Sequence, residues 1–291
     1  MQEQESQTSL TVTPGEKSIG EIIKDSHSLT AEQVEQVLAH QRQTGLRFGE
    51  AAVALGLIKR EGVIWALSRQ FNYDFEADAS SFPELVVAGK PFSHQAEAFR
   101  ELRSQLLETV FKPGQRARAL AVVSPEVGDG KTYFAANLAV AFSQLGGRTI
   151  LIDADMRSPR AQEVFRSQMQ QGLSAVLAGK CEATVEQPVP SLSNLFFLPV
   201  GVIPPNPTEL AQRPALGLLL NELAQRFDHI IVDTPAASHG SDARIIATVC
   251  GSALLVGRQN ATRLDGMKLL SQGLKRAGVA IAGVAMNGYG R

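Results

Sequence analysis

The segment Ser124-Pro-Glu-Val-Gly-Asp-Gly-Lys-Thr132 constrains the fold more than any other part of the chain. It follows an apolar run and directly precedes a helical pattern, which is the strand, glycine-rich turn and helix of a phosphate-binding loop. Gly128 and Gly130 allow backbone N–H groups to turn towards phosphate oxygens, and the start of the helix adds further unpaired donors. Pro125 stands where the first glycine of the usual pattern would be.

This loop predicts a nucleotide triphosphate and Mg²⁺ as ligands. Lys131 is expected to reach the β- and γ-phosphates, and the hydroxyl of Thr132 is expected to bind the metal ion. The residues predicted to contact the nucleotide through the loop are Gly128, Asp129, Gly130, Lys131 and Thr132.

Carboxylates end two later apolar runs. The run Thr149 to Asp153 leads into Asp155, and the run His229 to Asp233 ends in a third acid. Alternate residues of a strand point to opposite faces, so the pair Asp153 and Asp155 must lie where the strand gives way to a loop. Ligands bind at this carboxyl edge in parallel sheets. Any one of these acids could instead only cap a helix, but three downstream of one phosphate-binding loop predict a metal and substrate site.

The remaining pattern predicts an α/β fold with a doubly wound, mostly parallel sheet. Continuous apolar runs separated by helical patterns are typical of strands buried on both faces. The expected strands are residues 119–124, 149–153, 195–200, 229–233, 253–256 and 281–286, and the expected helices include 132–145, 209–226 and 264–277.

The N-terminal part predicts a small α-helical repeat domain. Residues 18–41 resemble residues 47–70 at a constant offset of 29 positions. Each copy reads as a short helix, a turn and an amphipathic helix, and Thr30 with Gln33 resembles a capping box. We expect a flexible tail over 1–17, the repeat domain over 18–73, a linker over 74–92 and the nucleotide-binding domain over 93–291.

Composition excludes several classes of protein. The chain has 28 Lys and Arg against 29 Asp and Glu, so its net charge of −1 offers no electrostatic case for a nucleic-acid partner. Two cysteines far apart, Cys181 and Cys250, predict neither a disulfide nor a zinc site. No apolar stretch is long enough for a transmembrane segment or a secretory signal, so we expect a cytoplasmic protein.

Residues from about Pro91 to Asn287 resemble the catalytic domain of the bacterial tyrosine kinases of polysaccharide export, relatives of the MinD/ParA ATPases. With no fused membrane segment and with its N-terminal repeat, the chain is most similar to the stand-alone kinases of exopolysaccharide operons (EpsG type). The matching motifs are Glu97-Ala-Phe-Arg100-Glu-Leu-Arg103, the phosphate-binding loop, Asp153/Asp155/Arg157, Gly172-Leu-Ser174, Leu198-Pro-Val-Gly201 with Pro204-Pro-Asn-Pro-Thr-Glu209, and Asp233-Thr-Pro235.

The resemblance implies a role for each matching residue. The ATP and Mg²⁺ positions of the family match Lys131, Thr132 and Asp233, and Asp155 would support the metal shell. Asp153 would accept the proton of the attacking tyrosine and is also implied to be a metal ligand. The set implied to be catalytic is therefore Lys131, Asp153, Asp155 and Asp233, and the set implied to bind metal is Thr132, Asp153 and Asp233. Asn287 matches a position that contacts adenine.

The triplet Glu97, Arg100 and Arg103 lies on one helix face at i, i+3 and i+6. It matches the motif through which members of this family pack into a ring. The alternative is a solvated face with a weak ion pair. The chain has only three tyrosines, Tyr73, Tyr133 and Tyr289, and Tyr289 is the candidate phosphoacceptor near the C-terminus.

The repeat resembles the N-terminal domain of type II secretion and pilus ATPases, in which two such motifs can bind cyclic di-GMP. The second copy keeps Arg47, Gly49, Gly56 and Gln70, whereas the first copy has Ser18 in place of the arginine. Losing an arginine removes a bidentate contact that serine cannot replace. The repeat is therefore expected either to bind cyclic di-GMP or to dock a protein.

These observations favour an ATP-dependent protein-tyrosine kinase that acts with a membrane chain-length determinant (Wzz-like) protein and lies at the inner membrane through that partner. One alternative is a MinD/ParA-like ATPase switch, although Glu126 stands where those proteins usually carry a signature lysine. Another is a non-catalytic, nucleotide-gated scaffold, which the scarcity of tyrosine favours.

Overall fold

The computed structural model describes residues 22–23, 29–59, 62–63, 66, 82–112, 119–181 and 186–288. The chain divides into two compact units, Met1–Phe75 and Glu76–Arg291. Each unit has its own hydrophobic core. None of the described helices is both long enough and apolar enough to cross a membrane.

The N-terminal unit contains α2 (Ala31–Thr44) and α3 (Phe48–Ala54). The predicted capping box at the start of α2 is confirmed. The N–H of Gln33 donates to Oγ1 of Thr30 at 3.3 Å, and the N–H of Thr30 donates to Oε1 of Gln33 at 2.9 Å. Gly45, with a φ of 73°, ends the helix in the left-handed conformation that glycine adopts without strain.

The core of this unit follows the sequence repeat. Three pairs of residues at the same offset are buried in one cluster: Ile23 with Ala52, Leu29 with Ile58, and Val37 with Ala66. Apolar side chains of the two copies are therefore buried together in one cluster.

The C-terminal unit is built on one seven-stranded sheet with the order β3-β4-β2-β5-β1-β6-β7. All neighbouring strands are parallel except β3 and β4, so the predicted doubly wound, mostly parallel α/β fold is confirmed. The strands are β1 (Ala119–Val123), β2 (Thr149–Asp153), β3 (Gln187–Val189), β4 (Leu192–Leu198), β5 (His229–Asp233), β6 (Gly251–Arg258) and β7 (Ala280–Asn287).

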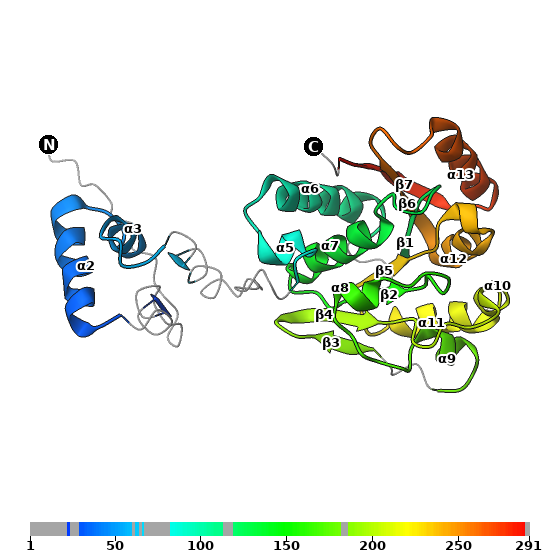
Figure 1. The fold of residues 1–291 in the computed structure, drawn as a ribbon, viewed down its shortest axis with the longest axis horizontal. Coiled ribbons are helices and arrows are strands. Elements are labelled where there is room, and N and C mark those ends of the chain that lie inside the picture. Colours follow the sequence, from blue (N-terminus) through cyan, green and yellow to red (C-terminus); the bar gives the residue numbers. More distant parts are fainter. Residues whose placement is uncertain are drawn as a thin grey trace, which may run out of the picture. The chain divides into compact units, whose positions relative to one another are not determined.

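Helices cover both faces of this sheet (Figure 1). Alternate residues of β1 enter opposite cores, since Leu120 and Val122 pack on one face and Ala121 and Val123 on the other. The first face is covered by α5 (Val86–Gly89), α6 (His94–Thr109), α7 (Lys131–Ser143) and α8 (Ala161–Val164). The second face is covered by α9 (Leu173–Leu177), α10 (Pro207–Ala211), α11 (Pro214–Leu223), α12 (Asp242–Cys250) and α13 (Leu264–Arg276), and a 3-10 turn, Ala237–His239, precedes α12.

The expected linker over 74–92 is too long at its C-terminal end. Leu85, Val87 and Ala88 are fully buried in the core beside α7. Asn137 of α7 fixes this segment, because its Oδ1 accepts from the N–H of Val87 at 3.1 Å and its Nδ2 donates to the carbonyl of Glu84 at 2.8 Å. Residues 82–92 are therefore part of the nucleotide-binding unit.

Candidate functional site

The phosphate-binding loop connects β1 to α7, as predicted. Gly128 has a φ of 84° and Gly130 a φ of 100°, a region that favours glycine. A Cβ atom on Gly130 would also clash with Nδ2 of Asn287. That same Nδ2 donates to the carbonyl of Asp129 at 3.1 Å. The end of β7 therefore lies against the loop, which brings Asn287 to the site where the sequence predicted it.

Asp129 stabilises the loop from within. Its Oδ2 accepts from the N–H of Glu126 at 2.9 Å, and its Oδ1 accepts from Oγ1 of Thr262 at 2.5 Å. Because both carboxylate oxygens accept hydrogen bonds inside the protein, this side chain holds the loop in shape. The role of Thr262 was missed by the sequence reasoning, since no local pattern links it to a loop so far away in the chain.

Asp233 lies at the end of β5 and is the exceptional carboxylate of the site. It is fully buried, and neither of its oxygens has a hydrogen-bond partner by geometry among the described residues. Burial raises the pKa of Asp233 to about 7, although the nearby Thr132 hydroxyl and the Lys131 ammonium group act in the opposite direction. Lys131 is itself buried, at 7% exposure.

This arrangement fits the ligand shell of Mg²⁺. The described residues contain no cluster of three or more His, Cys, Asp or Glu side chains that could hold a metal ion. Mg²⁺ is usually bound by one or two carboxylates together with phosphate oxygens and water, so it does not need such a cluster. The two unengaged oxygens of Asp233 and the hydroxyl of Thr132 are donors of the required kind.

Asp153 lies beside Asp233 in the sheet, because the two residues are paired in register between β2 and β5. Its oxygens accept from the N–H groups of Asp155 at 3.0 Å and Ala161 at 3.2 Å. Burial, and next the charge of Asp233, raise the pKa of Asp153 well above its usual range. Two adjacent buried carboxylates thus disfavour each other's ionisation.

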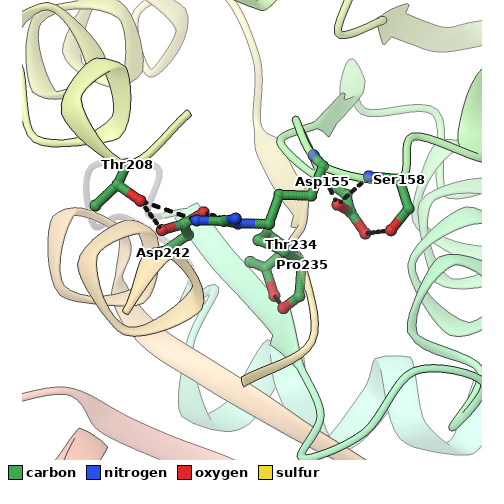
Figure 2. A network of polar contacts seen from close by, with 7 residues as sticks. Asp155, Ser158, Thr208, Thr234, Pro235 and Asp242 are labelled. Atoms are coloured by element: carbon green, nitrogen blue, oxygen red, sulfur yellow. Dashed lines mark hydrogen bonds and ion pairs between the residues drawn. The ribbon is translucent and has the colours of Figure 1, made fainter. Parts of the chain in front are cut away.

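Asp155 lies in the loop that follows β2, as the alternation argument predicted. Its Oδ1 accepts from the N–H groups of Arg157 at 3.2 Å and Ser158 at 3.0 Å, and the Ser158 hydroxyl contacts Oδ2 at 3.4 Å (Figure 2). Thr234 anchors the segment that follows Asp233, because its Oγ1 donates to the carbonyl of Val122 at 2.8 Å. Four of the predicted residues, Lys131, Asp153, Asp155 and Asp233, therefore meet at one edge of the sheet.

The triplet on α6 is turned mainly towards its own chain. The Arg103 Nη1 donates to the carbonyl of Ala141 in α7 at 2.7 Å. Arg100 donates to the carbonyl of Pro91 at 2.5 Å and pairs with Glu97 at 2.8 Å. Only the Glu97 side chain is largely exposed, at 71%. The two arginines thus fix α6 to its surroundings, and a ring interface stays a prediction.

A pocket of about 450 Å³ opens between α6, α7 and β7. Asn287 and Gly288 line one end of it, next to the phosphate-binding loop. The Tyr133 ring also lines the pocket and packs against Phe99, with ring centroids 5.8 Å apart. Tyr133 is therefore a packed side chain, and its pKa is raised by burial. Tyr289 lies outside the described residues.

The backbone conformation or the available space explains why glycine occupies positions 49 and 56 of the second repeat copy. A Cβ on Gly49 would lie 2.5 Å from Cγ1 of Val63, and Gly56 has a φ of 68° in the turn after α3. Arg47 precedes α3, and its backbone N–H donates to Oε2 of Glu50 at 3.0 Å. Arg47 is exposed. Gln70 lies outside the described residues. Cyclic di-GMP binding by the repeat stays a prediction.

Residues 120–289 match the CobQ/CobB/MinD/ParA nucleotide binding domain. The tyrosine-protein kinase CpsD of Streptococcus pneumoniae is 31% identical over 206 residues, which cover 70% of this chain and 90% of that protein. The tyrosine-protein kinase Wzc of Salmonella typhimurium is 33% identical over 205 residues, or 70% of this chain. The chain spans only 28% of the length of Wzc.

Solved structures of similar fold cover the same region. The kinase domain of the Escherichia coli tyrosine kinase Etk matches with a TM-score of 0.66 and 31% identity, covering 70% of this chain and 79% of that chain. The septum site-determining protein MinD of Pyrococcus horikoshii, solved with Mg-ADP, matches with a TM-score of 0.54 and 28% identity over 60% of this chain and 72% of that chain.

Proposed function

We propose that this chain is an ATP-dependent protein-tyrosine kinase, because it belongs to the bacterial tyrosine-kinase branch of the CobQ/CobB/MinD/ParA nucleotide-binding family. The single observation that carries the proposal is Asp233, whose two buried and unengaged oxygens lie at the start of the helix that bears Lys131 and Thr132. A carboxylate is costly to bury without a partner, and Mg-ATP supplies the partner.

The proposed reaction transfers the γ-phosphoryl group from ATP to a tyrosine hydroxyl. The tyrosine oxygen forms a bond to the γ-phosphorus, the bond to the β–γ bridging oxygen breaks, and ADP leaves. Asp153 accepts the hydroxyl proton, and its raised pKa makes it a stronger base than an exposed aspartate. Lys131 and the backbone N–H groups of the loop hold the β- and γ-phosphates, so most of the catalysis is positioning.

Thr132 and Asp233 would hold Mg²⁺, with Asp155 fixing the loop beside them. When bound, Mg²⁺ neutralises the charge that develops on the β- and γ-phosphate oxygens. The contact of Asn287 with the loop supports an adenine position near the pocket between α6, α7 and β7.

The proposed cellular role is control of exopolysaccharide or capsule export. The partner would be a membrane chain-length determinant protein, which also brings the kinase to the inner membrane. Tyr289 or a tyrosine of a partner would receive the phosphate, and Glu97 would contribute to contacts between kinase subunits. The two named kinase relatives support the activity, while the partner and the assembly are inferred from the resemblance.

The test is incubation of the full chain with Mg²⁺ and γ-labelled ATP, with and without the cytosolic segment of the membrane partner. Mass spectrometry then locates the phosphate. We expect label on Tyr289 or on a partner tyrosine, and none in Lys131→Met. Release of labelled phosphate to water without labelled tyrosine would indicate an ATPase switch instead, and neither product would indicate a nucleotide-gated scaffold.

A further inference from the structure

Three side chains at the carboxyl edge of the sheet form a closed set of hydrogen bonds, which we call the Arg157 clasp: Arg157, Thr208 and Asp242. The Arg157 Nε donates to Asp242 Oδ2 at 2.6 Å, and its Nη2 donates to Thr208 Oγ1 at 3.0 Å. The Thr208 hydroxyl in turn donates to Asp242 Oδ1 at 2.6 Å. Figure 2 shows Thr208 and Asp242 together on one side of the network, and Asp155 with Ser158 on the other.

The clasp joins the two segments that carry the acids of the site. Arg157 belongs to the loop after β2, and its own backbone N–H donates to the carboxylate of Asp155. Asp242 begins α12, which directly follows the segment after Asp233. Since Thr234 anchors the start of that segment to β1, the clasp fixes its other end to the Asp155 loop.

Burial and geometry make this a tightly held contact. The Asp242 side chain is 3% exposed and the Arg157 side chain 33% exposed. The hydrogen bond to Asp242 is the main cause that raises the pKa of Arg157. A guanidinium presents its donors in a rigid plane, so it holds two acceptors at once in a way that lysine cannot. A Cβ on Gly240 would lie 3.9 Å from Nη2, so the chain passes close beside the guanidinium.

We propose that Asp242 and Thr208 are positioning residues for phosphoryl transfer. They hold Arg157, and through it they keep Asp155 at a fixed distance from Asp233. They need not touch the nucleotide or the tyrosine. The inference rests on the proposed kinase function, since it assigns these residues a part in that reaction. Transfer that depends on alignment loses rate when a supporting contact is removed.

Steady-state kinetics with Mg-ATP and a synthetic tyrosine peptide test this role. In Asp242→Asn we expect kcat to fall by about tenfold or more, whereas KM for ATP stays within about twofold, because alignment is lost but the phosphate-binding loop is untouched. Thr208→Val is expected to lower kcat in the same direction. Thr208→Ser keeps the hydroxyl and should restore kcat to within about twofold of the wild type.

The matched control is Glu186→Gln. Glu186 pairs with Arg226 at nearly the same burial, 5% and 32% exposed, but neither residue belongs to the loops of the site. Its kcat should stay within about twofold of the wild type. A fall equal to that of Asp242→Asn would overturn the proposal, because it would show that any buried ion pair supports the rate.

Amide hydrogen exchange reports on the Arg157 clasp independently of kinase activity. The N–H groups of Arg157 and Ser158 should exchange faster in Asp242→Asn than in the wild type, and should be unchanged in Glu186→Gln. If the wild type labels no tyrosine, the kinase proposal fails while exchange still reports on the clasp. The positioning role is overturned if Thr208→Val keeps the wild-type kcat. It is also overturned if Asp242→Asn folds and keeps both kcat and the exchange rate, or if KM for ATP is the only parameter that changes in these variants.

Discussion

Asp233 is completely buried, and its two oxygens have no hydrogen-bond partner among the residues that the structure describes. This combination has a consequence for stability as well as for binding. Its pKa of about 7 in the folded protein lies above the ordinary value of 3.8. Between these values the unfolded chain has released the proton and the folded chain has kept it. Unfolding therefore releases a proton in this window, and the folded state becomes less stable as pH rises through it.

We predict that Asp233→Asn removes part of this pH dependence. Without nucleotide, wild-type stability should fall as pH rises from about 4 to about 7, and the variant should be more stable than the wild type at pH 8 by about 1–3 kcal/mol, since no charge is then buried unpaired. Asp153 keeps a contribution of the same sign. Urea unfolding at pH 5 and pH 8 measures both effects.

The control for this prediction is the same pair of proteins with Mg-ADP. The nucleotide complex should stabilise the wild type at pH 8 and have little effect on the variant, because the metal ligand is gone. A variant that is less stable than the wild type at pH 8 without nucleotide would contradict the account of Asp233.

At the residue scale, the sequence predicted where the site residues lie better than it predicted which hydrogen bonds they make. Asp153, Asp155 and Asp233 could be placed because acids at the ends of buried parallel strands must meet at one edge. That the Asp129 carboxylate is hydrogen-bonded inside the loop depends on a neighbour, Thr262, that is distant in the sequence. The lack of a hydrogen-bond partner for Asp233 among the described residues likewise follows from the tertiary structure. The Arg157 contacts to Thr208 and Asp242 were missed for the same reason.

At the scale of elements, the six predicted strands were found because each is a continuous apolar run of strand length. β3 was missed because it has only three residues, one of them Pro188, and lies at the edge of the sheet. α5 was missed because four residues give no helical period, and its acidic, proline-bearing surroundings resemble a linker. Its burial comes from packing against α7, which no local pattern reveals.

The contacts of α6 predict different outcomes for its charged residues. Arg103→Ala removes a donor from the Ala141 carbonyl, so we expect the free energy of unfolding to fall by about 1–3 kcal/mol. Glu97→Ala changes an exposed side chain and should stay within about 0.5 kcal/mol of the wild type. Chemical denaturation of both variants provides the measurement.

The same variants test the ring interface. If Glu97 contacts a second subunit, Glu97→Ala should reduce the assembled fraction in light scattering while leaving stability unchanged. Normal assembly in that variant would argue against a role for Glu97 between subunits. A loss of assembly in Arg103→Ala alone would only reflect the displacement of α6.

At the scale of the whole molecule, the two compact units predict separable ligand binding. If the repeat domain binds cyclic di-GMP, calorimetry should detect it in the full chain, and Arg47→Ala should weaken binding by at least about tenfold through loss of a bidentate contact. Arg42→Ala, an exposed arginine on α2, is the matched control. No heat in the wild type would leave the protein-docking alternative for this domain.

The repeat-related pairs in the N-terminal core also bear on how such a domain can be inherited. Because Ile23, Leu29 and Val37 each pack in one cluster with their counterparts in the second copy, the two copies share the core that the described residues form. Recombination that moved a single copy into another protein would therefore transfer a sequence without a fold. The smallest exchangeable module is the duplicated pair, and the boundary that recombination must respect lies outside both copies.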